Sequence, residues 1–211
     1  MATKDKLVYL PLRARGEAIR MLYVVARKKF DDTRITGDDF AAYKPKTPFG
    51  QLPVLETTEG MLCNSNVIAR HVARKLGLSG KTQWEETLHD LVTECAQDCI
   101  NMYALPNIYN WQVFKLVPVP ENSEELLQKA KTKWTKVLEY VESLAKKRGK
   151  KYIVSNELGL ADLFLFAAME FSKTGTPDIM TLTPWAKQFT AKVAADPKLT
   201  KYLADRPEAT V

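Results

Sequence analysis

The chain has 211 residues, of which 45% are hydrophobic and 27% charged, and it carries a net charge of +6. This length is sufficient for one large domain or two small ones with a real core. No apolar run approaches the roughly 18 residues that span a bilayer, and the first residues lack the apolar core of a secretory signal, so we expect no membrane partner. The three cysteines are too few, and odd in number, for a disulfide framework, which favours a cytoplasmic location.

Strand and helix patterns alternate over the first 78 residues. Short strands are predicted at residues 7–10, 30–35, 54–57 and 61–63. Helices are predicted at residues 16–28 and 65–76, with a helical turn at 38–43. A β-α-β unit followed by a β-β-α unit is the order of an α/β, thioredoxin-like domain, which we assign to residues 1–78, with a linker at residues 79–82.

The remainder of the chain, residues 83–211, is predicted to form an all-helical domain. Apolar side chains recur every three or four positions over residues 123–148, as in an amphipathic helix. Residues 160–171 are apolar on nearly every side, which predicts a buried central helix. Gly159 stands at the cap of this helix, where glycine is acceptable, and Asp162 stands at the third position after it.

A proline turn and a helix start together predict a binding site. Leu52-Pro53 directly precedes an apolar strand, which suggests a forced backbone geometry with a cis X-Pro bond. Such bonds are uncommon in folded proteins and usually mark a tight turn. The turn interrupts strand pairing, so the backbone N–H and C=O of Leu52 are free to pair with a short extended peptide. Ser65 is predicted as the N-cap of the next helix, whose free N–H groups attract a carboxylate. These features predict a seat for a small peptide that bears carboxylates.

The positive charge is concentrated in the same part of the chain. The first 78 residues hold 14 Lys and Arg against 8 Asp and Glu, whereas the remainder holds 17 against 17. A basic half suits an anionic ligand. Nucleic acid is the alternative anionic partner, but the basic residues are dispersed and no nucleic-acid-binding module is present, so we expect no nucleic-acid partner.

These motifs together resemble a cytosolic glutathione transferase. The order and spacing match that family from about residue 6 to about residue 206, through Tyr9, Arg13–Arg20, Lys44, Gln51–Pro53 and Ser65–Arg70. The chain is most similar to the sigma class, which includes glutathione-dependent prostaglandin D synthases and lens S-crystallins. The resemblance implies a homodimeric detoxification enzyme that binds glutathione as co-substrate, requires no metal, and conjugates glutathione to hydrophobic electrophiles. The alternatives are a prostaglandin isomerase, a catalytically inactive crystallin-like structural protein, and a non-catalytic interaction module.

Tyr9, at the end of the first predicted strand, is the catalytic candidate. The resemblance implies that its hydroxyl donates a hydrogen bond to the glutathione sulfur and so favours the thiolate. An ordinary tyrosine pKa of about 10 makes Tyr9 a neutral donor rather than a base. Sister classes use a serine in the loop just after this position, where this chain has Pro11 and Leu12. The resemblance makes Arg15 the supporting cation. Without the resemblance, Tyr9 would be interpreted as a core tyrosine on a half-buried strand.

The resemblance also implies which residues bind glutathione. They are Tyr9, Phe40, Lys44, Gln51, Leu52, Pro53, Asn64, Ser65 and Asp98. Phe40 stands where sigma enzymes commonly have tryptophan, so an indole N–H donor is lost. Asn64 stands where glutamine is usual, and its side chain keeps the amide but is one methylene shorter. Asp98 is expected to reach across the dimer to the γ-glutamyl ammonium, with a solvated acidic residue as the alternative.

The electrophile is expected to bind between the two predicted domains. The pocket is assigned to Leu10, Arg13, Met102, Tyr103, Pro106 and Tyr109. The alternative for Met102 and the tyrosines is ordinary helical core, and for Arg13 it is a solvated loop position. Phe49 corresponds to the aromatic residue that some classes insert into the partner subunit.

Three further motifs have simpler interpretations than a site. Gly80-Lys81-Thr82 lacks the leading glycine of a phosphate-binding loop. Cys95 and Cys99, with His89 nearby, are better explained as buried free cysteines than as a metal site. The basic run over residues 146–151 is better explained as a helix C-terminus that ends at a glycine than as a nucleic-acid patch.

Overall fold

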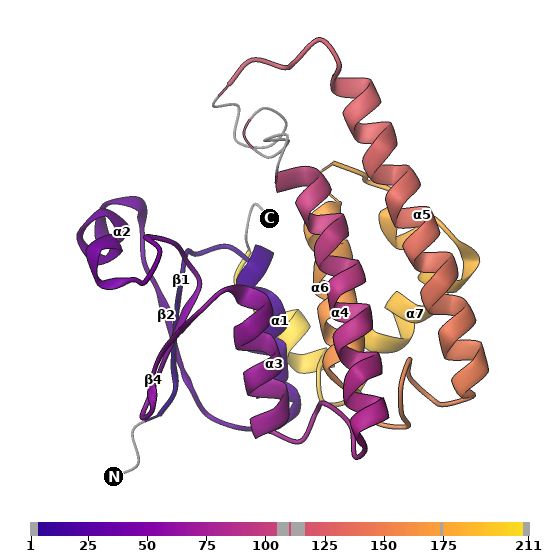
Figure 1. Ribbon diagram of the computed structural model, residues 1–211, viewed down its shortest axis with the longest axis horizontal. Helices are drawn as coiled ribbons and strands as arrows, with labels where there is room; N and C mark the ends of the chain where they lie inside the picture. The colour runs from indigo at the N-terminus through magenta and orange to yellow at the C-terminus, as the bar shows by residue number, and fades with distance from the viewer. Residues whose placement is uncertain (1–3, 105–109, 111–116, 174, 209–211) are drawn as a thin grey trace.

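The first part of the chain folds as a four-stranded sheet with helices (Figure 1). The computed structural model describes residues 4–104, 110, 117–173 and 175–208. The strands are β1 (Lys6–Tyr9), β2 (Asp31–Arg34), β3 (Val54–Thr57) and β4 (Gly60–Cys63), in the order β2-β1-β3-β4. The helices of this part are α1 (Ala14–Val25), α2 (Gly37–Tyr43), the 3-10 turn η1 (Lys44–Lys46) and α3 (Ser65–Lys75). The predicted thioredoxin-like order is confirmed.

Pairing within the sheet decides which side chains face the helices. β1 runs parallel to β2 and antiparallel to β3, with Val8 opposite Val54. Side chains alternate between faces along a strand, so Leu7 and Tyr9 share one face. Both belong to the core formed with α1 and α3, and Figure 1 shows these two helices between the sheet and the helical part of the chain. Tyr9 therefore ends its strand against α1.

The second part of the described chain is helical. It comprises α4 (Gln83–Ala104), α5 (Ser123–Arg148), α6 (Leu160–Ser172), the 3-10 turn η3 (Ile179–Thr181), α7 (Pro184–Ala194) and α8 (Thr200–Asp205). Every residue of α6 except Glu170 is buried, which confirms the predicted central helix. α6 packs against both α4 and α1. The domain boundaries predicted at residues 78 and 83 stay a prediction.

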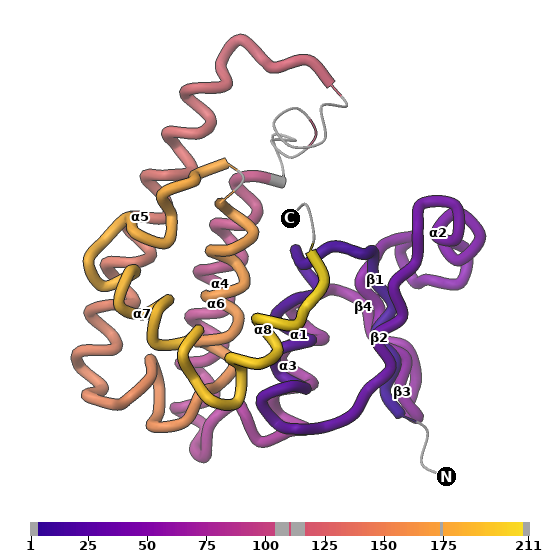
Figure 2. The backbone as a smooth tube through the Cα atoms, turned by 180° about the vertical axis from the view of Figure 1, so that it is seen from behind, coloured from indigo at the N-terminus to yellow at the C-terminus, as the bar shows by residue number. Residues whose placement is uncertain are grey.

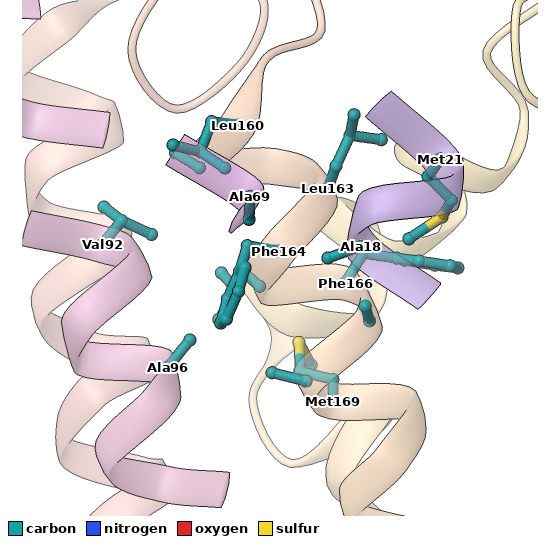
Figure 3. Close-up of a cluster of buried hydrophobic side chains, with 14 of the residues drawn as sticks. Ala18, Met21, Ala69, Val92, Ala96, Leu160, Leu163, Phe164, Phe166 and Met169 are labelled. Carbon is teal, nitrogen blue, oxygen red and sulfur yellow. The ribbon is translucent and has the colours of Figure 1, made fainter. Parts of the chain in front are cut away.

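Figure 3 shows how α6 joins the two parts through apolar packing. Its side chains form one cluster with residues of three other helices, namely Ala18 and Met21 of α1, Ala69 of α3, and Val92 and Ala96 of α4. The three alanines let the helix backbones approach closely, and the larger side chains Leu163, Phe164 and Phe166 of α6 pack among the residues of the cluster. The sheet and the helical part thus share one hydrophobic core.

The start of α6 explains why Gly159 stands at its cap. Asp162 Oδ2 accepts from the Gly159 amide at 3.1 Å, which is the half of a capping box that the third residue supplies, and Asp162 Oδ1 accepts from the Ile153 amide at 3.0 Å. Gly159 has no side chain for the other half. A Cβ at Gly159 would lie 2.7 Å from His89 Cε1 and 2.9 Å from the Leu78 carbonyl oxygen. Glycine is therefore required here by close packing, whereas the sequence indicated only that it is an acceptable cap.

Buried ion pairs of Arg206, the residue after α8, join the end of the described chain to α1 and α6. Arg206 Nη1 lies 2.7 Å from Glu17 Oε1, and Arg206 Nη2 lies 2.6 Å from Glu170 Oε1. Tyr202 also donates to Glu17 at 3.0 Å, and Glu17 is 2% exposed. Figure 2 shows α8 beside α1 on the back of the molecule. This network fixes the position of α1, the helix that packs against Tyr9, relative to α6.

Candidate active site

A cavity of about 820 Å³ opens where the sheet ends beside α4. Its walls include many of the residues predicted to act, namely Tyr9, Leu10, Arg15, Phe40, Gln51, Leu52, Pro53, Asn64 and Ser65. They come from β1, α1, α2, the loop before β3 and the start of α3. The structure therefore brings together segments that are far apart in the sequence.

Tyr9 lies at the inner wall of this cavity and is 6% exposed. Burial raises the pKa of its phenol, and this outweighs the backbone amide and the guanidinium of Arg15, which lower it. Arg20 also lies over the Tyr9 ring, with its guanidinium carbon 5.8 Å from the ring centroid. A raised pKa keeps the phenol neutral at physiological pH, so Tyr9 can donate a hydrogen bond into the cavity.

Gly16 lies directly against the Tyr9 ring. A Cβ at Gly16 would lie 2.6 Å from Tyr9 Cδ1 and 3.2 Å from Tyr9 Cγ. Gly16→Ala should therefore displace the ring and lower kcat/KM for glutathione conjugation about tenfold, because small displacements of a reacting group are costly. Steady-state kinetics with a chlorinated nitrobenzene would measure this effect.

Gly37→Ala is the matched control for this change, since nothing lies within 4 Å of a Cβ at Gly37. Gly37→Ala should leave the melting temperature unchanged or higher, because alanine is the better helix former. Gly16→Ala should lower the melting temperature, because the added Cβ overlaps the buried Tyr9 ring. Wild-type kinetics in Gly16→Ala would show that the position of the Tyr9 ring is not critical.

The loop before β3 shapes the opposite wall. The Leu52-Pro53 bond is cis, as predicted. The ladder of β1 with β3 ends at Val8 and Val54, so Leu52 lies beyond the last pair, at an open sheet end. Lys44 is exposed and packs over Gly50, where a Cβ would lie 3.0 Å from Lys44 Cε. Lys44 therefore stands beside the cavity rather than in its wall.

The start of α3 differs by one residue from the prediction. Asn64, not Ser65, is the N-cap, and its Oδ1 accepts from the Asn66 amide at 3.2 Å. Asn64 has a φ of +70°, and asparagine tolerates positive φ better than serine does. Ser65 is the first helical residue and is buried in the cavity wall. One side of the Asn64 amide is thus engaged in capping.

A row of polar side chains from α4 completes the cavity. Gln97 Nε2 donates to Asn101 Oδ1 at 2.9 Å, and Arg15 Nη2 donates to the same oxygen at 3.4 Å. Asn66 Nδ2 donates to Glu94 Oε1 at 3.3 Å. The sequence analysis missed Glu94, Gln97 and Asn101, although polar residues spaced by three and four positions on one face of a helix are a signal that could have identified them.

Several predicted site residues lie elsewhere. Arg13 is not in the cavity wall, and its guanidinium donates to the Pro207 carbonyl at 3.4 Å. Tyr103 is fully buried in the core, where it shares a hydrogen bond with Thr176, and it does not line this cavity. Met102 is half-buried against the core. Pro106 and Tyr109 lie outside the described residues.

Asp98 faces away from the cavity of its own chain. It is exposed on α4 and pairs with Lys133 of α5 at 3.1 Å. Any contact with glutathione would therefore have to be made in a second copy of the chain, as the sequence analysis expects.

The described part of the chain offers no cluster of three or more His, Cys, Asp or Glu side chains that could hold a metal ion. Cys99 is buried, and burial raises the pKa of its thiol. His89 caps α6 by accepting from the Ala161 amide at 3.0 Å, and burial lowers the pKa of His89 to about 4. No described helix has the length and apolar character needed to cross a membrane.

Comparison with known proteins places these features in a family. The glutathione S-transferase N-terminal domain matches residues 7–74, and the C-terminal domain of the same family matches residues 101–206. The probable glutathione S-transferase 8 of Caenorhabditis elegans is 32% identical, over 96% of this chain and 97% of its own length.

Solved structures agree with the sequence matches. The glutathione S-transferase of Ascaris lumbricoides has a TM-score of 0.88 at 30% identity, covering 99% of this chain and 100% of its own. Monomeric Na-GST-3, a glutathione S-transferase of the hookworm Necator americanus, has a TM-score of 0.84 at 32% identity, with the same coverage. The chain therefore belongs to the glutathione S-transferase family, as a transferase that uses glutathione as its co-substrate.

Proposed function

We propose that the protein is a sigma-like glutathione transferase in which Tyr9 stabilises the glutathione thiolate for attack on hydrophobic electrophiles. The observation that carries the proposal is the position of Tyr9 in the cavity wall, beside Arg15 and the Leu52-Pro53 turn, where burial raises the pKa of its phenol. The thiol proton leaves to solvent, the sulfur forms a bond to the electrophilic carbon, and the electrons of the broken bond depart with the leaving group.

The free energy needed to lower the thiol pKa of glutathione is of the size that a hydrogen bond from Tyr9 and the charge of Arg15 can contribute. A free cysteine thiol has a pKa of about 8.5, so little thiolate is present at neutral pH. Lowering that pKa by two units requires about 2.7 kcal/mol. One hydrogen bond to a charged group contributes about 1.5–3 kcal/mol, and the Arg15 guanidinium adds to it.

The remaining walls suit the rest of the tripeptide. Leu52, beyond the sheet ladder, offers its main chain to the cysteinyl residue of glutathione. Phe40 and Gln51 line the cavity at the end that we assign to the glycine, with Lys44 beside them. The Ser65 end of α3 faces the other carboxylate. Leu10 borders the space that we assign to the electrophile, with Pro106 and Tyr109 as further members of that proposal.

We also propose a homodimer. Phe49 is 75% exposed beside the cavity, and Val67 of α3 and Leu91 of α4 expose further apolar surface. In such a dimer Asp98 of one subunit would approach the site of the other. The three cysteines are all free, which supports a reducing, cytosolic location.

A titration of bound glutathione tests the proposed chemistry. The ultraviolet absorbance of the thiolate should show a thiol pKa below the free value of about 8.5 when the wild-type protein is present in excess. The protein should also bind immobilised glutathione and turn over a chlorinated nitrobenzene.

The alternatives predict different results. Binding with an unshifted thiol pKa and no turnover would contradict the proposal and favour a crystallin-like structural protein. Absence of both binding and turnover would favour an interaction module. Turnover of a lipid endoperoxide, without turnover of the nitrobenzene, would favour the isomerase.

A further inference from the structure

A second cavity lies where the chain passes from α3 to α4 and from α5 to α6. Its volume is about 210 Å³, whereas a single water needs only roughly 10–15 Å³. Its walls are formed by residues 77, 78, 80 and 81, by residues 150 and 155–159, and by Glu85 and His89 of α4. None of these residues lines the active-site cavity. The second cavity is therefore a separate candidate site, where the two parts of the chain meet.

His89 directs a hydrogen-bond donor into the second cavity. The side chain is 1% exposed, and its Nδ1 accepts from the Ala161 amide at 3.0 Å. Burial lowers the pKa of His89 to about 4, so the ring is neutral at physiological pH and carries its proton on Nε2. Nε2 has no hydrogen-bond partner among the described residues and faces Gly159, where an added Cβ would lie 3.2 Å away. A buried donor without a partner indicates an acceptor supplied by a ligand.

Two lysines at the rim of the second cavity add positive charge. Lys81 and Lys150 are both exposed, and neither ammonium pairs with a carboxylate of the described chain. The Asn156 amide supplies a further donor, because its Oδ1 is engaged with the Lys151 N–H at 3.0 Å and its NH2 group is left over. Both α4 and α6 begin at this cavity, so the positive ends of their dipoles also favour an anion.

The carboxylates in the walls leave this positive character in place. Glu85 is engaged at both oxygens, since Oε2 accepts from the Lys81 backbone N–H at 2.8 Å and Oε1 accepts from Arg148 at 3.2 Å. The charge of Arg148 therefore balances that of Glu85. Glu157 is exposed and forms no ion pair within the described chain. One unpaired carboxylate thus stands against the two unpaired ammonium groups and the two neutral donors.

We propose that the second cavity binds a phosphate group, either as inorganic phosphate or as the monoester of a small organic molecule. His89 Nε2 and the Asn156 amide donate hydrogen bonds to its oxygens, and Lys81 and Lys150 balance its charge. A doubly charged phosphate group offers only acceptors, which matches a site built from donors. Recognition comes from side chains of three separate segments, so it does not need the glycine loop that residues 80–82 fail to form. A bound phosphate group would join the linker before α4 to the loop before α6.

The histidine rings give a direct test, because the chain has only two of them. Proton–nitrogen correlation spectra of the imidazole rings would be recorded near neutral pH while inorganic phosphate replaces chloride at constant ionic strength. The ring signals of His89 should shift and saturate. Those of His71, which lies on α3 outside the second cavity, should not move. The same titration with phenyl phosphate distinguishes the two sources, since the ligand that binds more tightly shows whether the site is shaped for free phosphate or for a monoester.

Charge variants identify the groups that bind. The double variant Lys81→Gln, Lys150→Gln should weaken phosphate binding about tenfold or more. Glu157→Gln removes the unpaired carboxylate and should strengthen binding about twofold. Lys147→Gln is the matched control, because Lys147 is an exposed lysine of the same basic run that does not line the second cavity, and it should keep the wild-type affinity. Melting temperatures show whether each variant remains folded.

Three results would overturn the proposal. They are the absence of a saturable His89 shift with either ligand, equal shifts of His71 and His89, and equal affinity of the double variant and Lys147→Gln. Glutathione binding and conjugation would be measured on the same samples. Because the two cavities share no wall residue, failure at one site is distinguishable from failure at the other.

Discussion

Tyr9→Phe should lower the turnover of a chlorinated nitrobenzene at least tenfold, which corresponds to a barrier increase of about 1.4 kcal/mol or more. The substitution removes only the hydroxyl that donates to the sulfur, so the thiol pKa of bound glutathione should rise toward its free value. Binding to immobilised glutathione should persist, because the Leu52 loop and the start of α3 are unchanged. Steady-state kinetics and the thiolate titration measure both effects.

Tyr140→Phe is the matched control, because Tyr140 is 46% exposed on α5 and lies outside the cavity wall. It should leave turnover and the thiol pKa at their wild-type values. If Tyr9→Phe behaved like Tyr140→Phe, another group would have to be the donor to the sulfur. Arg15, whose backbone amide and guanidinium both act on the Tyr9 phenol, would then be the next candidate.

Asp162→Ala should lower the free energy of unfolding by about 2–4 kcal/mol. Asp162 is fully buried, and alanine would leave the backbone N–H groups of Ile153 and Gly159 without an acceptor in the core. Each unsatisfied buried donor costs about 1–3 kcal/mol. Because α6 lies at the centre of the shared core, the loss should appear in urea unfolding of the whole protein.

Asp162→Asn separates the role of charge from that of hydrogen bonding. Asparagine keeps one acceptor oxygen, so it should be less destabilising than alanine. Burial raises the pKa of the Asp162 carboxyl to about 7 from an ordinary value of 3.8, against the backbone donors that lower it. Stability from a group with a raised pKa is complete below the ordinary value and is lost as the pH rises through the folded value.

The advantage of wild type over Asp162→Asn should therefore narrow between about pH 4 and about pH 7, the two pKa values of the carboxyl. A constant difference over this range would mean that the carboxyl does not titrate there. An advantage that widens with pH would mean that the carboxyl is ionised in the folded protein and that its backbone donors dominate.

The first and last residues of a helix were predictable from the sequence where residues typical of helix ends mark both of them. α5 begins and ends at the predicted residues, and Gly149 follows it with a φ of +58°. α1 instead begins two residues earlier than predicted and ends three residues earlier, at Val25. Arg27 adopts a φ of +53° just after it. No glycine or proline marks that end, so periodicity alone extended the predicted helix too far.

The site was predictable where its residues belong to short motifs. Tyr9, the Leu52 turn and the start of α3 are each defined within a few neighbouring positions, and the cavity contains them all. The contribution of α4 depends on how that helix turns against the sheet. Gln97 faces the cavity, whereas Tyr103 faces the core. A helical pattern shows that two faces exist but does not show which one meets a ligand.

The shared packing of α1 and α6 has a consequence for how the molecule comes apart. Because Ala18 and Met21 of the first part are covered by α6, a fragment ending after α3 would present this apolar helix face to water and should aggregate. Heating should accordingly give a single cooperative transition, with the sheet and the helices melting together. The position of Tyr9 is therefore stabilised by α6, whose residues are translated long after the strand that carries Tyr9.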